Sequence, residues 1–260
     1  MIRQRVGGVL AARVRRPGPS GDLLRTLASL RGDGPVVAAP DLWRPLVLAP
    51  HPDDESLGVG GTLAGLVAAG AEPLVCVVTD GEATPGTGLD AAEVVARRRG
   101  EAETACSVLG VGAPVFLHLP DGRVRDHVVR LAAEVVRLVA EHRADGVFAP
   151  WLLDGHDDHE AVSRAVALAD LPAETAVWAY ETWAPLVPNR VVDVTVHQDV
   201  KERAVAAHVT AHLSFDIAAL VALGRYRSAH GLRGLGHAEA FLVLPHHEHR
   251  ALAEQLATRS

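Results

Sequence analysis

The sequence is short of basic side chains. Of its 260 residues, 25 are Lys or Arg, with Lys201 as the single lysine, against 32 Asp or Glu, which gives a formal net charge of −7. Proteins that bind nucleic acid or anionic membranes carry a basic excess on the face that meets phosphate groups. The charge balance therefore argues against both classes of partner.

Long apolar segments are also missing. No run of eighteen apolar residues occurs, and a helix that crosses a bilayer needs about that many. Residues 1–21 carry five arginines on both sides of a short apolar run, without the cleavage pattern of a secretory signal. We therefore expect a soluble, cytoplasmic protein with no membrane span.

Cysteine is scarce. Cys76 lies in an apolar, strand-like run and Cys106 in a helix-like run, and no C-x-x-C pair occurs. Disulfide and metal-binding frameworks need more cysteines or a different spacing. Two buried free thiols in a reducing cytosol are the simplest interpretation.

Hydrophobic patterning predicts one α/β domain. From residue 45, short apolar runs alternate with helical periodicity, which indicates repeated β-α units. The strands are continuous apolar runs, as expected when both faces of a sheet are covered. We expect a Rossmann-like α/β fold, a mostly parallel sheet with helices on both faces. The expected strands lie at 45–50, 73–79, 115–119, 146–150, 176–180 and 191–196, and the expected helices at 62–69, 91–109, 128–142, 159–169 and 200–211.

A Pro/Gly cluster at 17–21 separates the N-terminus from the rest of the chain. We expect residues 1–43 to be a packed, partly helical extension, with an amphipathic helix over 22–31. Residues 44–260 are expected to form the single α/β domain.

Polar residues gather where the first expected strand ends, as Pro50-His-Pro-Asp-Asp-Glu55 followed by three glycines. Ligands of open α/β sheets bind at the carboxyl ends of strands. Three acids and a histidine are costly to gather there unless a cation offsets their repulsion. His51 and one acid are suited to bind Zn²⁺, which leaves another carboxylate to take a proton from water. For this cluster alone, a turn in which Asp53 or Asp54 caps the next helix is the simpler interpretation.

A second cluster changes that balance. The strand at 146–150 is followed by Asp154-Gly-His-Asp-Asp-His159. Two His/Asp clusters at the same edge of one sheet can supply the three protein ligands of a catalytic zinc site, with a position left open for water. The sequence therefore favours a metal site.

Five motifs together resemble the PIG-L/LmbE-like family of zinc-dependent N-deacetylases, which remove acetyl groups from N-acetylglucosaminyl compounds. They are PHPDDE at 50–55, TDGE at 79–82, RRGE at 98–101, LPDG at 119–122 and GHDDH at 155–159. The resemblance covers residues 45–244. It implies one Zn²⁺ per chain, or another divalent metal in its place, held by His51, Asp54 and His159.

The resemblance also implies the catalytic roles. Asp53 matches the general base, and His156 matches a residue that stabilises the tetrahedral intermediate or protonates the amine. Asp158 would orient His156 through a hydrogen bond.

Three further residues match positions near the substrate. Arg98 and Asp121 match residues that hold sugar hydroxyls in family members, and Glu82 lies near the same mouth. From the residues alone, Arg98 is equally a helix-surface arginine and Glu82 a solvated loop acid. The chain departs from some family members at Asp154, where they place a Tyr that helps stabilise the oxyanion. Either another donor serves here, or His156 and the zinc act alone.

The implied function is zinc-dependent hydrolysis that removes the N-acetyl group from an N-acetylglucosaminyl-type conjugate with metal-activated water. An amidase that cleaves a larger acyl amide, such as a thiol conjugate or natural product, needs the same residues. A non-catalytic binding protein would be expected to have lost Asp53 or a ligand. The expected partner is a small amino-sugar or amide substrate, and a homo-oligomer is compatible with the sequence.

Other histidines and tryptophans have simpler interpretations. The tract His246-His-Glu-His249 stands without a second cluster, so we expect a solvated helix start. Trp151, Trp178 and Trp183 are candidates for a sugar subsite, with buried packing favoured for Trp178.

Overall fold

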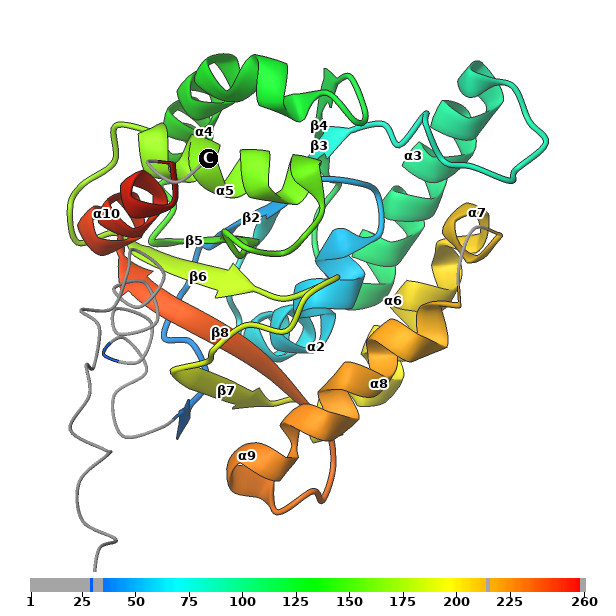
Figure 1. The fold of residues 1–260 in the computed structure, drawn as a ribbon. Helices are drawn as coiled ribbons and strands as arrows, with labels where there is room; N and C mark the ends of the chain where they lie inside the picture. The colour runs from blue at the N-terminus through cyan, green and yellow to red at the C-terminus, as the bar shows by residue number, and fades with distance from the viewer. Residues whose placement is uncertain (1–28, 30–34, 214–215, 258–260) are drawn as a thin grey trace, which may run out of the picture.

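A computed structural model describes residue 29 and residues 35–213 and 216–257. Within them an eight-stranded sheet has the order β1-β7-β8-β6-β5-β2-β3-β4 (Figure 1). Its pairings are parallel except those of β8 with β6 and with β7, which are antiparallel. The strands are β1 (Val36–Val37), β2 (Leu46–Ala49), β3 (Leu74–Thr79), β4 (Val115–Leu119), β5 (Gly146–Pro150), β6 (Ala176–Tyr180), β7 (Arg190–Asp193) and β8 (Ala238–Pro245).

Helices cover both faces of this sheet (Figure 1). On one face α2, α3 and α6 pack over the strands and enclose one apolar core, and on the other α4 and α5 enclose a second, with α10 beside α5. The predicted fold class is therefore confirmed. The helices are α2 (Asp54–Ala68), α3 (Ala91–Leu109), α4 (Val128–His142), α5 (Asp157–Leu168), α6 (Gln198–Ala207), α7 (Val209–His212), α8 (Ile217–Arg227), α9 (Ala229–Leu232) and α10 (His246–Ala257), with short 3₁₀ helices η1 (Val124–His127) and η2 (Thr195–His197).

Most expected elements match the structure closely, and the largest difference lies in α2. This helix begins at Asp54 rather than near residue 62, because its glycines are places of close packing rather than helix breakers. A Cβ atom on Gly58 would collide with the buried Tyr180 ring, and one on Gly61 would lie 2.6 Å from the Cβ of Val194. The glycines thus let α2 lie close to the sheet and hold the chain after β2 in place.

The N-terminal extension lies mostly outside the described residues, including nearly all of the helix expected over 22–31. Its last part joins the sheet, since Val36 and Val37 form β1 and pair with Arg190 and Val191 of β7. Both cysteines are free and buried, as expected. No helix among the described residues is long and apolar enough to cross a membrane.

The expectation of a solvated start for α10 is wrong at two histidines. His246 and His249 are each only 2% exposed. Their Nε2 atoms hydrogen-bond the carbonyl oxygens of Val166 and Ser163 on α5, at 2.9 and 3.1 Å. These residues anchor α10 against α5, a contact between distant segments that a single sequence does not reveal.

The buried His249 predicts an acid-sensitive fold. Burial lowers its pKa to about 4, against the opposing effect of the hydrogen bond to Ser163. In the unfolded chain a histidine has a pKa of about 6.5, so as the pH falls the unfolded state takes up the proton before the folded state does. We expect this group to lower the free energy of unfolding by up to roughly 3 kcal/mol as the pH falls from about 6.5 to about 4.

The measurement is denaturant unfolding across that pH range for the wild type and the H249Q variant, both of which retain His246. The variant should lose less stability toward low pH than the wild type. Equal losses in the two proteins would contradict the prediction.

Candidate active site

The pairing of β2 with β5 brings the two polar clusters together. These neighbouring parallel strands have Leu46 opposite Val147 and Val47 opposite Phe148. The PHPDDE motif leaves the carboxyl end of β2, and the segment from residue 151 leaves the same end of β5. The chain passes from β2 to β3 on one side and later returns to β5 on the other, so the clusters meet at a topological switch point, where open sheets bind ligands.

Three side chains form a compact triangle of donor atoms. His51 Nδ1 lies 3.3 Å from Asp54 Oδ2 and 3.3 Å from His159 Nε2, and the last two atoms are 3.2 Å apart. All three residues are buried. Four tetrahedral ligands around Zn²⁺ at 2.0–2.1 Å would have donor atoms about 3.3–3.4 Å apart. The three residues therefore fit a divalent metal ion.

The far nitrogen of each of these histidines faces carboxylates. His51 Nε2 lies 3.2 Å from Asp121 Oδ1 and 3.3 Å from Asp158 Oδ2, and His159 Nδ1 lies 3.0 Å from Asp154 Oδ1. A carboxylate in this position holds the ring proton on the far nitrogen and leaves the near one free to bind a metal. Burial lowers the pKa of His159, but Asp54 and Asp154 raise it to about 9. The carboxylates thus favour positive charge at this point.

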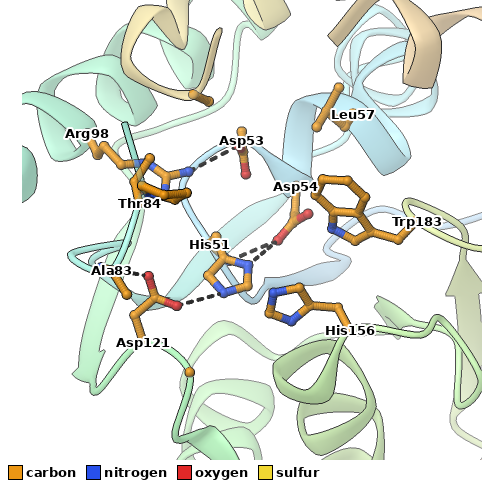
Figure 2. A pocket seen from close by; sticks show the side chains of 13 residues that line it. His51, Asp53, Asp54, Leu57, Ala83, Thr84, Arg98, Asp121, His156 and Trp183 are labelled. Atoms are coloured by element: carbon orange, nitrogen blue, oxygen red, sulfur yellow. Dashed lines mark hydrogen bonds and ion pairs between the residues drawn. The ribbon is translucent and has the colours of Figure 1, made fainter. Parts of the chain in front are cut away.

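Asp53 stands at the N-cap of α2 with φ of 150°, outside the usual range for a residue other than glycine. Such a conformation typically costs about 1–3 kcal/mol and persists only where neighbours enforce it. Its N–H donates to Glu55 Oε2 at 3.1 Å, and its carboxylate accepts a hydrogen bond from Arg98 Nη2 at 3.0 Å (Figure 2). Burial raises the pKa of Asp53 to about 6, although Arg98 opposes the shift. A strained carboxylate with this pKa is suited to accept a proton.

His156 lies at the N-cap of α5, beside the two histidines of the triangle. Its ring centroid is 4.8 Å from that of His51 and 4.9 Å from that of His159. Burial and the charges of those two rings lower its pKa, which favours a neutral ring. The Asp158 N–H donates to His156 Nδ1 at 3.2 Å, and this contact assigns the ring proton to Nε2. His156 therefore offers one hydrogen-bond donor, and it lines the cleft (Figure 2).

The structure corrects one expected contact. The Asp158 carboxylate does not orient His156, which meets Asp158 through the backbone N–H instead. It faces His51 and accepts hydrogen bonds from the N–H groups of Gly122 and Val124 at 2.6 and 3.1 Å. His156 caps α5, so its Nδ1 already accepts a hydrogen bond from the first turn of that helix. The Asp158 carboxylate instead binds backbone N–H groups of the segment after β4.

The three expected substrate contacts are engaged within the protein. Arg98 is buried, and besides Asp53 it donates to Pro52 O at 2.7 Å and to Thr84 Oγ1 at 2.7 Å, so it is not a helix-surface residue. Asp121 lines the cleft, while its Oδ2 accepts the Ala83 N–H. Glu82 Oε1 accepts the Asp121 N–H at 2.9 Å. These side chains fix the loops that form the wall of the cleft.

The cleft beside the triangle has a volume of about 500 Å³. Of the three candidate tryptophans, Trp151 and Trp178 are buried, whereas Trp183 lines the cleft, is 44% exposed and stacks at 6.5 Å on His156. Figure 2 shows the Trp183 ring beside Asp54 and His156. The cleft is also lined by apolar Leu57, Ala83, Pro85 and Ala211.

Sequence reasoning missed a support for Asp53. Glu55, which holds the Asp53 N–H, has its other oxygen 2.8 Å from Nε2 of the fully buried His208. His208 lies between α6 and α7, more than 150 residues along the chain. Glu55 was visible as the last residue of PHPDDE, but nothing in the sequence marked His208 as its partner.

Comparison with known proteins places this chain in a family. Residues 46–169 match the model of the family described as GlcNAc-PI de-N-acetylase, PIG-L. The diacetylchitobiose deacetylase of Thermococcus kodakarensis is 30% identical over 190 residues, which cover 65% of this chain and 70% of that protein. The 1D-myo-inositol 2-acetamido-2-deoxy-alpha-D-glucopyranoside deacetylase of Rhodococcus opacus is 43% identical over 91 residues, 32% of this chain and 31% of that protein.

The fold has a solved counterpart as well. The N,N'-diacetylchitobiose deacetylase of Pyrococcus horikoshii superposes with a TM-score of 0.68 at 24% identity, over 90% of this chain and 96% of that one. The family match covers both clusters and the strands that carry them. The chain belongs to the PIG-L family of GlcNAc-PI de-N-acetylases.

Proposed function

We propose that this protein is a metal-dependent hydrolase that removes the N-acetyl group from an N-acetylglucosaminyl-type conjugate and releases acetate and an amine. The observation that carries the proposal is a proton-accepting carboxylate, Asp53, in the same cleft as the triangle of His51, Asp54 and His159. The deacetylases of acetylated amino sugars among its relatives support the substrate class.

Zinc is the metal that we propose for the triangle, one ion per chain. Two imidazoles and one carboxylate are the donor set of many catalytic zinc sites. When bound, a divalent cation there supplies Lewis acidity that acidifies water and polarises a carbonyl group. Asp121, Asp154 and Asp158 keep the two histidine rings oriented for it.

Asp53 serves as the general base. Its carboxylate takes a proton from the water that attacks the amide carbon, and the proton then goes to the amine nitrogen as the C–N bond breaks. Arg98 and Glu55 hold Asp53 in its strained conformation, so its position does not depend on the substrate.

His156 is proposed to hold the carbonyl oxygen as negative charge develops on it. Its Nε2–H is the donor for this role, because Nδ1 already accepts a hydrogen bond from the Asp158 N–H. A donor of this kind is typically worth roughly 3–4 kcal/mol of transition-state stabilisation. Asp154 is a buried carboxylate and cannot replace the Tyr of other family members as a donor, so His156 is the side chain that we propose for this stabilisation.

We also propose a cytoplasmic location and a single catalytic domain over residues 44–260. Two buried free thiols are consistent with a reducing compartment. The sheet from β2 to β8 is continuous, and β1 in the preceding extension adds to its edge.

Removing the proposed base tests the mechanism. The D53N variant should release amine from N,N'-diacetylchitobiose with kcat lowered by about 10²–10⁴-fold, because no group then accepts the proton. Its zinc content should equal that of the wild type. D157N, the same change at an exposed acid of the second cluster, serves as the matched control and should retain wild-type activity. Near-wild-type turnover by D53N at saturating zinc would refute the role of Asp53.

Removing the metal tests the cofactor. Treatment with a chelator followed by desalting should abolish acetate release, and added Zn²⁺ should restore it. After dialysis, H159A should hold far less zinc than the wild type by elemental analysis, because one corner of the triangle is lost. H247A, at an exposed histidine, should hold a full equivalent. Full activity of metal-free wild-type protein would exclude a metal-dependent reaction.

A further inference from the structure

Asp154 joins the proposed metal site to the wall of the cleft. It follows β5, is 1% exposed and carries no contact to the cleft itself. One oxygen, Oδ1, lies 3.0 Å from Nδ1 of His159. The other, Oδ2, accepts hydrogen bonds from the N–H groups of Thr182 at 3.2 Å and Trp183 at 3.1 Å. One buried carboxylate thus contacts a member of the triangle and the backbone that carries the exposed aromatic ring.

We propose that Asp154 is a positioning residue with two tasks, an inference that rests on the proposed function. It fixes the His159 ring so that Nε2 faces the metal, and it fixes the segment that places Trp183 over the cleft.

The first task follows from the charge of Asp154 beside the ring of His159. The Asp154 carboxylate lies within ion-pair distance of Nδ1, and its negative charge favours the His159 proton on that nitrogen, which leaves the lone pair of Nε2 in the triangle. The ring is fully buried, so its two nitrogens are shielded from bulk solvent. Carboxylates that hold a metal-binding histidine in this way typically change metal affinity by about 10–100-fold when they are lost. The negative charge of Asp154 also adds to that of Asp54 beside the proposed cation.

The second task concerns the segment at 181–186. Two buried carboxylates, Asp154 and Glu181, hold this segment, and they have different partners. Asp154 holds the N–H groups of Thr182 and Trp183, whereas Glu181 accepts hydrogen bonds from Arg227 at 2.7 and 2.6 Å and from the Leu186 N–H at 3.0 Å. Only the first support touches a residue of the triangle. Asp154 therefore links the position of the His159 ring to the position of the backbone that carries Trp183.

Asp154 and Glu181 form a natural pair of test and control. Both are buried carboxylates that anchor the same segment, and each loses one charge in D154N or E181Q. Zinc dissociation constants are measured by competition with a chromogenic chelator, on proteins whose folding is checked by circular dichroism. We expect the constant to rise by about 10–100-fold in D154N and to stay within about twofold of wild type in E181Q.

The second task has a kinetic readout. With zinc saturating, we expect D154N to raise the KM for N,N'-diacetylchitobiose several-fold. W183A, which removes the aromatic ring itself, should also raise this KM. An unchanged KM in D154N beside a raised KM in W183A would overturn this task.

One measurement needs no variant that folds. Histidine-selective ¹⁵N NMR of the metal-free wild type, in which no metal ion occupies Nε2, should show a proton on Nδ1 of the His159 ring. A ring protonated on Nε2 alone, or equal zinc affinity of D154N and the wild type, would overturn the first task. If the wild type itself bound no stoichiometric zinc, both the proposed function and the inference about Asp154 would be refuted. If the wild type binds zinc and only D154N behaves unexpectedly, the proposed function stands and the Asp154 inference fails alone.

Discussion

The parallel pairing of β2 with β5 is the constraint on which the rest of the structure depends. It places the ends of two strands that are 100 residues apart side by side at one edge of the sheet. His51 and Asp54 come from one end and His159 from the other, and their donor atoms then meet within 3.3 Å. A sheet with another strand order would hold the same two motifs apart.

This edge concentrates charge that an apolar core cannot hold by itself. The carboxylates of Asp54, Asp121, Asp154 and Asp158 surround two buried imidazoles, and each ring has an acid at its far nitrogen. Burying these groups is costly unless they are paired and a cation balances them. The arrangement is therefore consistent with a metal site whose orientation is built into the protein before substrate arrives, which is the condition for strong electrostatic stabilisation.

Asp53 has a strained backbone, and the residues around it hold it in that conformation. Asp53 adopts an unfavourable backbone conformation, and α2 behind it packs closely through Gly58 and Gly61. Glu55 with His208 and the Arg98 guanidinium hold it from two sides. Arg98 thus acts on the reaction through Asp53. The wall of the cleft follows the same pattern. Asp121 borders the open space and also accepts the Ala83 N–H, and Glu82 holds the Asp121 backbone from behind.

Much of this protein was determined by local sequence. Continuous apolar runs and helical periodicity depend on neighbouring residues, so β4, β5, β6, α3 and α4 were predicted at their observed bounds. The two His/Asp motifs were legible because each stands where an apolar strand ends. Tertiary structure alone decided which distant groups meet: the carboxylate of Asp158 faces His51 rather than His156, Asp154 holds His159 and the Trp183 backbone, and His246 and His249 are buried against α5. Each of these contacts depends on how helices and loops pack across the sheet, and a single sequence carries no local signal for that packing.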